Sequence, residues 1–380
     1  MSGILVGGSP SLKKPKTTQI YGVEWNFGVA SCLLSRLADA TGLADPQPAV
    51  GSNAGSSPFD TLYPWSEMVE FNIVNDEVSH QKGDASFSRT SYDTCVRIPK
   101  FWYKVELGSS SYKLYIATGA EEGYALHPAF YRGDGKTRDY IYVGRYNTGG
   151  GYVTRSGIAP LVSLTRAVFR SNSAGKGADW WQYDIATYSA ISMLYLVEYA
   201  DWNSQTAIGR GYVDASAAIN NGGTDGMAYH TGRAAGTDGL TAVQYRGIEN
   251  LWGNVWDFVD GINFNGATPY FCLIPSRFAD DTSTNYTGLS YNALATAGNV
   301  AYPTRQGVDA SNSWLNLPTT GGGSDASYIP DGWWSNTGWR ILLVGGYWSY
   351  ASSAGLFARN ASNASSTADA GVGGRLLFLP

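Results

Sequence analysis

The sequence predicts an α+β fold, and three observations lead to that prediction. Hydrophobic residues make up 43% of the 380 residues, which is enough for a folded core. Between residues 68 and 147, several segments are rich in β-branched and aromatic residues that partly alternate with polar ones, as is typical of strands. One segment, 178–202, carries apolar residues at helical spacing. We therefore expect a chain with many strands and one long helix.

The first part of the chain, residues 1–94, is expected to be a β-rich or extended segment for assembly or attachment. Residues 1–20 are interpreted as an arm, and 42–60 is rich in Gly, Pro, Ser and Ala, as in a loop or linker. Four aromatic residues in this part would be buried either between subunits or in a core of the same chain, and the sequence leaves both open: Trp25, Phe27, Trp65 and Phe71.

The strands expected next are 68–80, 95–107, 112–118 and 139–147, and turns such as 133–136 favour antiparallel hairpins. In the helix at 178–202, Tyr188, Ile191, Leu194 and Tyr195 share one face, and other faces also carry apolar residues. We therefore expect a helix that is buried on most sides. After Gly209 the chain is Gly-rich, with short strands expected at 241–247, 255–259, 339–347 and 374–379.

The composition excludes several classes of protein. Only 15% of residues are charged and the net charge is −5, which argues against nucleic acid as a partner. Three widely spaced cysteines exclude a disulfide scaffold and a cysteine zinc site. The sequence shows neither a signal peptide nor a run of about 20 apolar residues, so we expect cytoplasmic synthesis without membrane insertion. With 14% aromatic residues, many rings must be partly exposed, as on a recognition surface.

Two C-terminal segments resemble a known family. The segment 245–262, YRGIENLWGNVWDFVDGI, is similar to a signature of the C-type-lectin-like fold, in the branch that contains formylglycine-generating enzymes and the variable proteins of diversity-generating retroelements. The segment 338–378 is similar to the closing element of the same branch. The middle of the chain is similar to tail-fibre or receptor-binding proteins of phages and prophages. The residues that would hold this scaffold are Trp252, Gly253, Asn254, Trp256, Gly345, Gly346, Trp348, Gly374 and Arg375.

This resemblance implies a C-type-lectin-like ligand-binding domain over residues 95–380, with a variable region at about 345–375 that the retroelement diversifies. The protein would then be a receptor-binding component of a phage or prophage tail. Its partners would be a protein or glycan of the host cell surface and other tail proteins of the virion. The resemblance also implies a homotrimer, because a weak single site gains from multivalency.

The variable region has the composition of a binding surface. Between Trp348 and Gly371 there is no Lys, Glu, Gln or Met, and small residues prevail beside a few large ones. Tyr provides contact area at low entropic cost, and Ser, Gly and Asn provide adaptable hydrogen bonds. A Ser- and Ala-rich loop without a partner remains an alternative. We expect one continuous exposed surface formed by Tyr347, Ser349, Tyr350, Ser353, Ala358, Arg359, Asn360, Ala361, Thr367 and Asp369, with Tyr350 and Arg359 as its anchors. The side chains expected to point inward or to hold the strands are Trp348, Phe357, Val372, Arg375 and Leu376.

The sequence argues against an enzyme. A formylglycine-generating enzyme needs a cysteine pair late in its domain, and only Cys272 is present there. The histidines at 80, 127 and 230 are far apart, and neither GxSxG nor HExxH occurs. Two alternatives remain: an enzyme of the formylglycine-generating type or an inactive relative of it, and a structural tail or baseplate component. We expect no cofactor. A structural calcium is left open by acidic residues in Gly-rich loops: Asp225, Asp238, Asp280, Asp281, Asp325 and Asp331.

Overall fold

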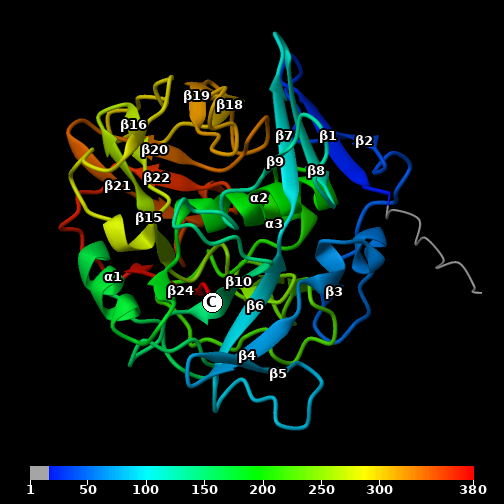
Figure 1. The fold of residues 1–380 in the computed structure, drawn as a ribbon, viewed down its shortest axis with the longest axis vertical. Coiled ribbons are helices and arrows are strands. Elements are labelled where there is room, and N and C mark those ends of the chain that lie inside the picture. The colour runs from blue at the N-terminus through cyan, green and yellow to red at the C-terminus, as the bar shows by residue number, and fades with distance from the viewer. Residues whose placement is uncertain (1–16) are drawn as a thin grey trace, which may run out of the picture.

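The computed structural model describes residues 17–380, and strands dominate it (Figure 1). Within these residues the strands form five sheets, and regular helix is confined to α1 (Arg166–Ala174), α2 (Ile185–Tyr199), α3 (Ser204–Ala207) and four short 3-10 turns. The expected α+β, C-type-lectin-like fold is therefore wrong. The Gly-rich segment after residue 209 shows no periodicity in its sequence. It nevertheless forms many short strands, which pair with segments far away in the sequence.

Two sheets contain most strands of the first half. The five-stranded sheet has, in spatial order, β2 (Ser35–Ala38), β1 (Ile20–Asn26), β8 (Ser111–Ala117), β7 (Trp102–Leu107) and β9 (Ala125–Leu126). The six-stranded sheet has β11 (Trp180–Gln182), β24 (Arg375–Phe378), β10 (Tyr140–Asn147), β6 (Asp93–Pro99), β4 (Glu70–Val74) and β5 (Glu77–Gln81). The strands predicted at 112–118 and 139–147 are confirmed as β8 and β10. The segments 68–80 and 95–107 are extended as predicted, but each contains two strands, β4 with β5 and β6 with β7, and β6 and β7 belong to different sheets. The pairings of these strands are antiparallel.

The other three sheets come mainly from the second half. One consists of β14 (Ile248–Glu249), β13 (Val243–Tyr245), β12 (Gly232–Arg233) and β3 (Ala49–Val50). The largest contains β17 (Thr287–Gly288), β16 (Thr268–Phe271), β15 (Trp256–Asn265), β21 (Trp339–Val344), β22 (Arg359–Ala361) and β20 (Trp333–Ser335), and β23 (Val372–Gly373) also pairs with β15. A separate hairpin consists of β18 (Pro303–Gln306) and β19 (Pro318–Gly321).

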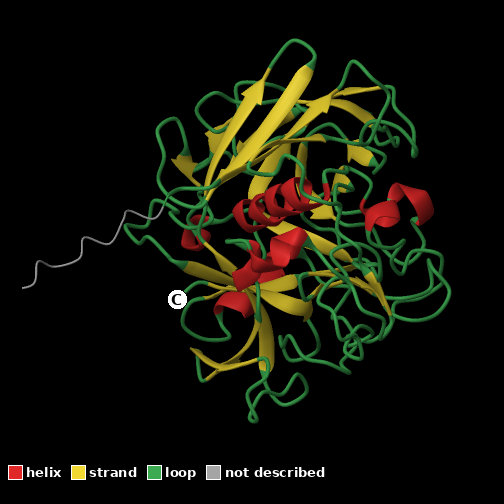
Figure 2. Ribbon diagram, turned by 90° about the vertical axis from the view of Figure 1, so that its right-hand side faces the viewer, coloured by secondary structure: helices red, strands yellow, loops and turns green. Residues whose placement is uncertain are grey.

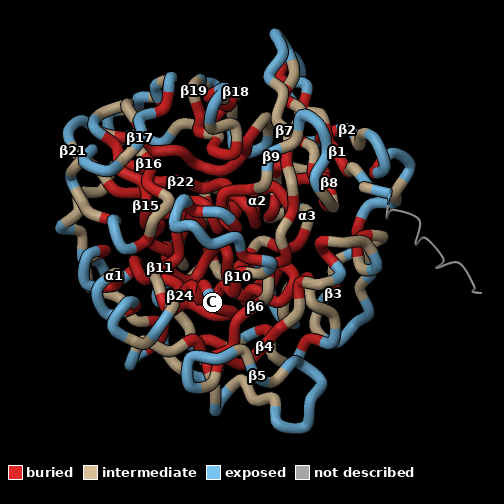
Figure 3. The backbone as a smooth tube through the Cα atoms, in the orientation of Figure 1, coloured by how far each residue is buried: buried red, intermediate tan, exposed pale blue. Residues whose placement is uncertain are grey.

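Helix α2 lies at the centre of the molecule, between the sheets (Figures 1 and 2). All 15 of its residues are buried, as the apolar residues on several of its faces predicted. Asp184 caps its N-terminus by accepting from the backbone N–H of Thr187, and also pairs with the buried Arg132. The buried backbone in Figure 3 surrounds this helix. The largest of three hydrophobic clusters joins the helix to residues of the sheets.

The expected boundary at residues 94 and 95 falls inside β6 (Asp93–Pro99). Strand β1 pairs with β8, β4 pairs with β6, and β3 pairs with β12, so residues before the boundary share sheets with residues far beyond it. The rings of Trp25 and Trp202 lie 5.3 Å apart in this shared core. Of the two interpretations of the N-terminal aromatics, the intrachain core is the one observed. The part of the expected arm at residues 1–16 lies outside the described residues.

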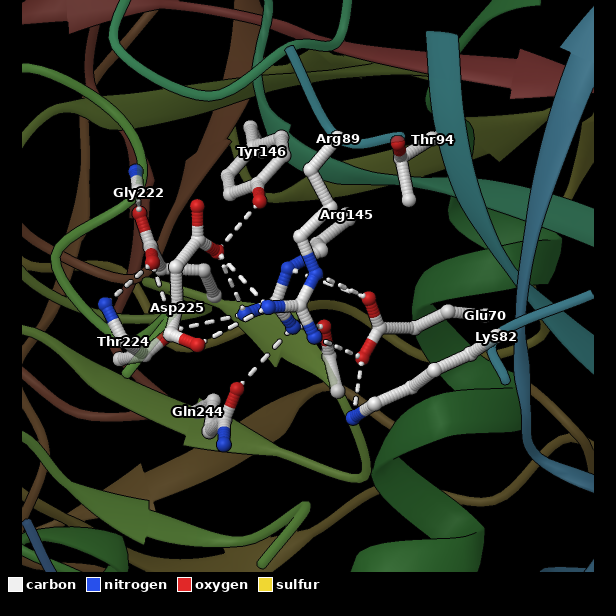
Figure 4. A network of polar contacts seen from close by, with 12 residues as sticks. Glu70, Lys82, Arg89, Thr94, Arg145, Tyr146, Gly222, Thr224, Asp225 and Gln244 are labelled. Carbon is white, nitrogen blue, oxygen red and sulfur yellow. Dashed lines mark hydrogen bonds and ion pairs between the residues drawn. The ribbon is translucent and has the colours of Figure 1, made fainter. Parts of the chain in front are cut away.

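A buried polar network also joins the two parts of the chain (Figure 4). Glu70 on β4 accepts hydrogen bonds from Arg89, at 2.7 and 2.8 Å, and from Lys82 at 2.9 Å. Arg145 on β10 lies 3.5 Å from Glu70 and donates to Asp225 at 3.1 Å. The network connects strands β4 and β10, which flank β6, to the loop that contains Asp225.

Candidate functional site

The scaffold around the predicted variable region is built from β15 and β21, which pair antiparallel from Asp257 to Asn265. Strand β23 pairs with the start of β15, and Arg375 at the start of β24 bonds Asp257 at 2.9 Å. The segments 245–260 and 338–348 therefore pack against each other and against the last strand. No helix in the described part of the chain is long and apolar enough to cross a membrane.

The scaffold residues named by the motifs are buried, apart from Trp348. Trp252 donates its ring N–H to the carbonyl oxygen of Gly209 at 3.1 Å. Gly345 has φ of 95°, and a Cβ there would lie 2.6 Å from the carbonyl oxygen of Leu251. Asn254 bonds the backbone N–H of Ile219 through its amide oxygen. These contacts fix the loops on which the C-terminal segment rests.

Residues 347–353 form a partly exposed loop that is held firmly by its backbone. The carbonyl oxygen of Trp348 accepts from the N–H of Ala215 at 2.7 Å, and the N–H of Trp348 donates to Asn254 at 3.1 Å. The N–H of Ala351 donates to the carbonyl oxygen of Val213 at 3.0 Å. Side chains on this loop are thus presented from a fixed backbone, which lowers the entropic cost of binding.

Three aromatic rings of this loop are half-buried and lie together. The ring of Tyr347 lies 4.8 Å from that of Trp348 and 4.7 Å from that of Tyr350. Tyr350 in turn packs on Trp256 and Trp334, at 5.1 and 5.3 Å, and both tryptophans are buried. Burial raises the pKa of Tyr350 above its ordinary value, so its hydroxyl stays protonated at neutral pH. We call Tyr347, Trp348 and Tyr350 the aromatic patch.

Of the ten predicted surface residues, six are at least partly exposed and four are buried. Ser349 and Asp369 are exposed, and Tyr347, Tyr350, Ser353 and Thr367 are half-buried. Exposure was wrongly predicted for the four that are buried: Ala358, Arg359, Asn360 and Ala361. The reason is that β22 lies between β20 and β21 in the largest sheet.

Arg359 has a structural role instead of the exposed position predicted for it. Its guanidinium donates to the hydroxyl of Tyr188 at 3.0 Å and to the carbonyl oxygen of Asn316 at 2.7 Å. The side chain is 5% exposed. Arg359 is therefore no anchor for a ligand on the surface.

The inward positions are confirmed for Phe357, Val372, Arg375 and Leu376 and wrong for Trp348, which is half-buried. The prediction for Trp348 assumed a strand, in which successive side chains point to opposite faces of the sheet. Strand β21 ends at Val344, and the chain then turns through Gly345 and Gly346 into a 3-10 turn at Ala351–Ser353. Alternation consequently does not apply at residue 348.

Near the patch, the sequence analysis missed Trp334 and named Asp325 only as a candidate calcium ligand. Trp334 supports Tyr350 from β20, and Asp325 accepts a hydrogen bond from Ser352 at 2.8 Å. The sequence does show two neighbouring tryptophans at 333–334. In a strand, neighbouring side chains point to opposite faces of the sheet, so this pair predicts a tryptophan on each face. Asp325 lies in a Gly- and Ser-rich loop that carried no such signal.

The acidic residues considered for calcium each have another partner in the described residues. Asp225 and Asp280 accept from arginines, Asp238 and Asp331 from backbone N–H groups, and Asp281 and Asp325 from serines. Among residues 17–380, no three His, Cys, Asp or Glu side chains come together as metal ligands would.

Burial shifts the pKa of His127, which was considered for catalysis, and of the Cys32 thiol. Burial lowers the pKa of His127 to about 3 and raises that of the Cys32 thiol to about 12. The three cysteines are free thiols. His127 thus stays neutral at physiological pH, and the Cys32 thiol stays protonated and weakly nucleophilic.

Comparison with known proteins gives no sequence match and only remote structural likeness. No family model matches the chain, and no curated protein matches its sequence. Among solved structures, the Major Tropism Determinant U1 Variant aligns over 92% of this chain and 81% of its own, with 10% sequence identity and a TM-score of 0.31. At that TM-score the likeness assigns neither fold nor function to this chain.

Proposed function

We propose that this chain is a receptor-binding protein of a phage or prophage tail, which binds the host cell surface through the aromatic patch and the neighbouring loop 362–370. The main support is the patch itself: three half-exposed aromatic rings on a backbone fixed by buried partners. Rings of this kind are the side chains that most often dominate binding energy. Ser349, Thr367 and Asp369 add small polar groups that suit hydrogen bonding to a ligand.

The test replaces Tyr347, whose ring belongs to the patch without packing on the two buried tryptophans. We expect Tyr347→Ala, combined with Ser349→Glu, to abolish binding of the labelled protein to a susceptible strain and to change the Tm little. Tyr131→Ala is the matched control, because Tyr131 is 49% exposed. Unchanged cell binding by the double variant would contradict the proposal, as would unfolding of that variant at the growth temperature.

The same proposal includes diversification by a retroelement, now restricted to exposed positions. A core position resists change because even one methylene alters packing. The gene should therefore lie beside a reverse transcriptase gene and a near-copy of its C-terminal coding segment. Differences between the two copies should fall at codons such as 347, 349 and 369 and spare 358–361. Sequencing the neighbourhood tests this, and changes concentrated at the buried codons would contradict it.

We also propose that the protein acts as a homotrimer, since linked weak sites gain effective affinity. Light scattering at micromolar concentration should return three times the mass of the chain. A monomer under these conditions would contradict the trimer and leave the binding surface unaffected.

A further inference from the structure

A polar pocket opens beside the 347–353 loop. Its volume is about 450 Å³, and it lies between α3, the loop at 208–210, Arg233, Asp238 and the segment around Asp325. Ser352 of the loop lines one wall. The pocket volume falls in the range of about 300–1,000 Å³ that small-ligand sites occupy. Because Ala351 and Ser352 connect it directly to the aromatic patch, a ligand on that surface would reach it.

Several side chains in this pocket use one polar atom in a hydrogen bond within the protein and have another polar atom free for a ligand. Gln205 donates its amide to the carbonyl oxygen of Ala351 at 2.9 Å, which leaves its amide oxygen without a partner among residues 17–380. Asp325 uses one carboxylate oxygen to accept from Ser352. Asn203 uses its oxygen to cap α3 and has its amide N–H groups free within the described chain. Groups oriented in this way bind a ligand at little extra entropic cost.

The charges in the pocket favour a neutral ligand. The lining contains two acidic residues, Asp238 and Asp325, and two basic residues, Arg210 and Arg233. Because both signs of charge are present in equal number, the pocket favours neither an anion nor a cation. Ile208 is the one large aliphatic residue of the lining, and most of the remaining lining residues have polar side chains. A ligand rich in hydroxyl groups fits best, because each hydroxyl both donates and accepts.

We propose that this pocket binds one neutral sugar unit, a hexose or N-acetylhexosamine, of a host-surface glycan. This inference rests on the proposed function and specifies the ligand class for one part of the same surface. The free acceptors are the oxygens of Gln205 and Asp325, and the free donors are on Asn203. Together they would donate to and accept from hydroxyls of the sugar ring.

The experiment measures saturation transfer by NMR from the purified full-length protein to free monosaccharides at millimolar concentration. The panel contains glucose, galactose, mannose, N-acetylglucosamine and N-acetylgalactosamine, with sialic acid as the anionic comparison. We expect transfer to at least one neutral sugar. Asp325→Ala and Asn203→Ser should each weaken it about three- to tenfold, the effect of one lost hydrogen bond. Serine at 203 still caps the helix, so folding is preserved.

Glu122→Gln is the control, because Glu122 is exposed in the connection between β8 and β9 and should leave the signal unchanged. Absence of transfer to every neutral sugar, or transfer to sialic acid alone, would overturn this proposal. If neutral sugars give no transfer while Tyr347→Ala with Ser349→Glu still abolishes cell binding, the receptor-binding function stands and the sugar pocket fails. If a neutral sugar gives transfer while that double variant still binds cells, the sugar pocket stands and the function proposed for the patch fails.

Discussion

Arg375 shows how one buried side chain can hold several loops. Its guanidinium donates to Asp257 at 2.9 Å and to four backbone carbonyl oxygens, those of Gly144, Arg145, Glu249 and Asn250, at 2.9 to 3.1 Å. These contacts use all five N–H donors that an arginine has. The sequence motif named this residue as scaffold, and the reason is now visible: lysine has neither the number nor the planar arrangement of donors.

We therefore expect Arg375→Met to lower the free energy of unfolding by about 3–5 kcal/mol, because it leaves Asp257 buried without its partner. Burial already raises the pKa of Asp257 despite the arginine. Urea denaturation measures the loss, and adding Asp257→Leu should recover part of it. A loss below about 1 kcal/mol in the single variant would show that the loops are held by other contacts.

Asp201 gives the chain a pH dependence near neutrality. Burial raises the pKa of Asp201 to about 6, from an ordinary value of 3.8, and nearby Asp45 adds to the rise. The folded protein therefore holds this proton more tightly than the unfolded chain does. Its contribution to stability is full below about pH 4 and is lost as the pH rises through 6. Relative to wild type, Asp201→Asn should gain Tm between pH 4 and 7, and parallel Tm curves for the two proteins would contradict this.

At the scale of elements, the C-terminal segment divides into a displayed loop and a core strand. Ser349 is exposed on the loop, whereas Ala358, one residue before β22, is completely buried. Ser349→Glu should change the free energy of unfolding by no more than about 0.5 kcal/mol. Ala358→Glu places a charge in the core and should cost at least about 3 kcal/mol. Denaturant titration of both variants checks this, and equal losses would mean that the division is wrong.

The same segment shows what the sequence could and could not predict. Periodicity located helix α2 and the extended segments that contain β4 to β8 and β10, because alternation and helical spacing are local signals. It did not locate the turns that divide 68–80 and 95–107, and it included β11 in the expected helix. The motifs around Trp252 and Gly345 drew attention to the segments that contain β15 and β21, although they did not show that these strands pair with each other. The small residues at 358 and 361 were ambiguous, because they suit both a variable surface and a strand packed between two others. The division into five sheets depends on pairings between distant segments, such as β3 with β12, which no local pattern shows.

At the scale of the whole molecule, the network around Glu70 links the N-terminal strands to the rest. Its arginine and lysine partners lower the pKa of Glu70 to about 2, although burial alone would raise it. The stability that this carboxylate contributes is therefore present above about pH 4.5 and is lost as the pH falls toward 2. We expect Glu70→Gln to be less stable than wild type at pH 7 and to differ less at pH 3. A difference that grows on acidification would contradict the assignment.

The unfolding of the chain should be one cooperative event, although its length would allow two domains. Removing residues 17–94 would take β1 and β2 from one sheet, β4 and β5 from a second and β3 from a third, and would expose the edges of β8, β6 and β12. It would also remove Trp25 and Trp65, both completely buried in the core that surrounds α2. Calorimetry of the full chain should show a single transition, and a fragment that begins at residue 95 should lack the near-ultraviolet circular dichroism of packed aromatic rings. Two separate transitions, or a fragment with native-like aromatic signals, would show that the two parts fold independently, and the shared sheets would then contribute little to stability.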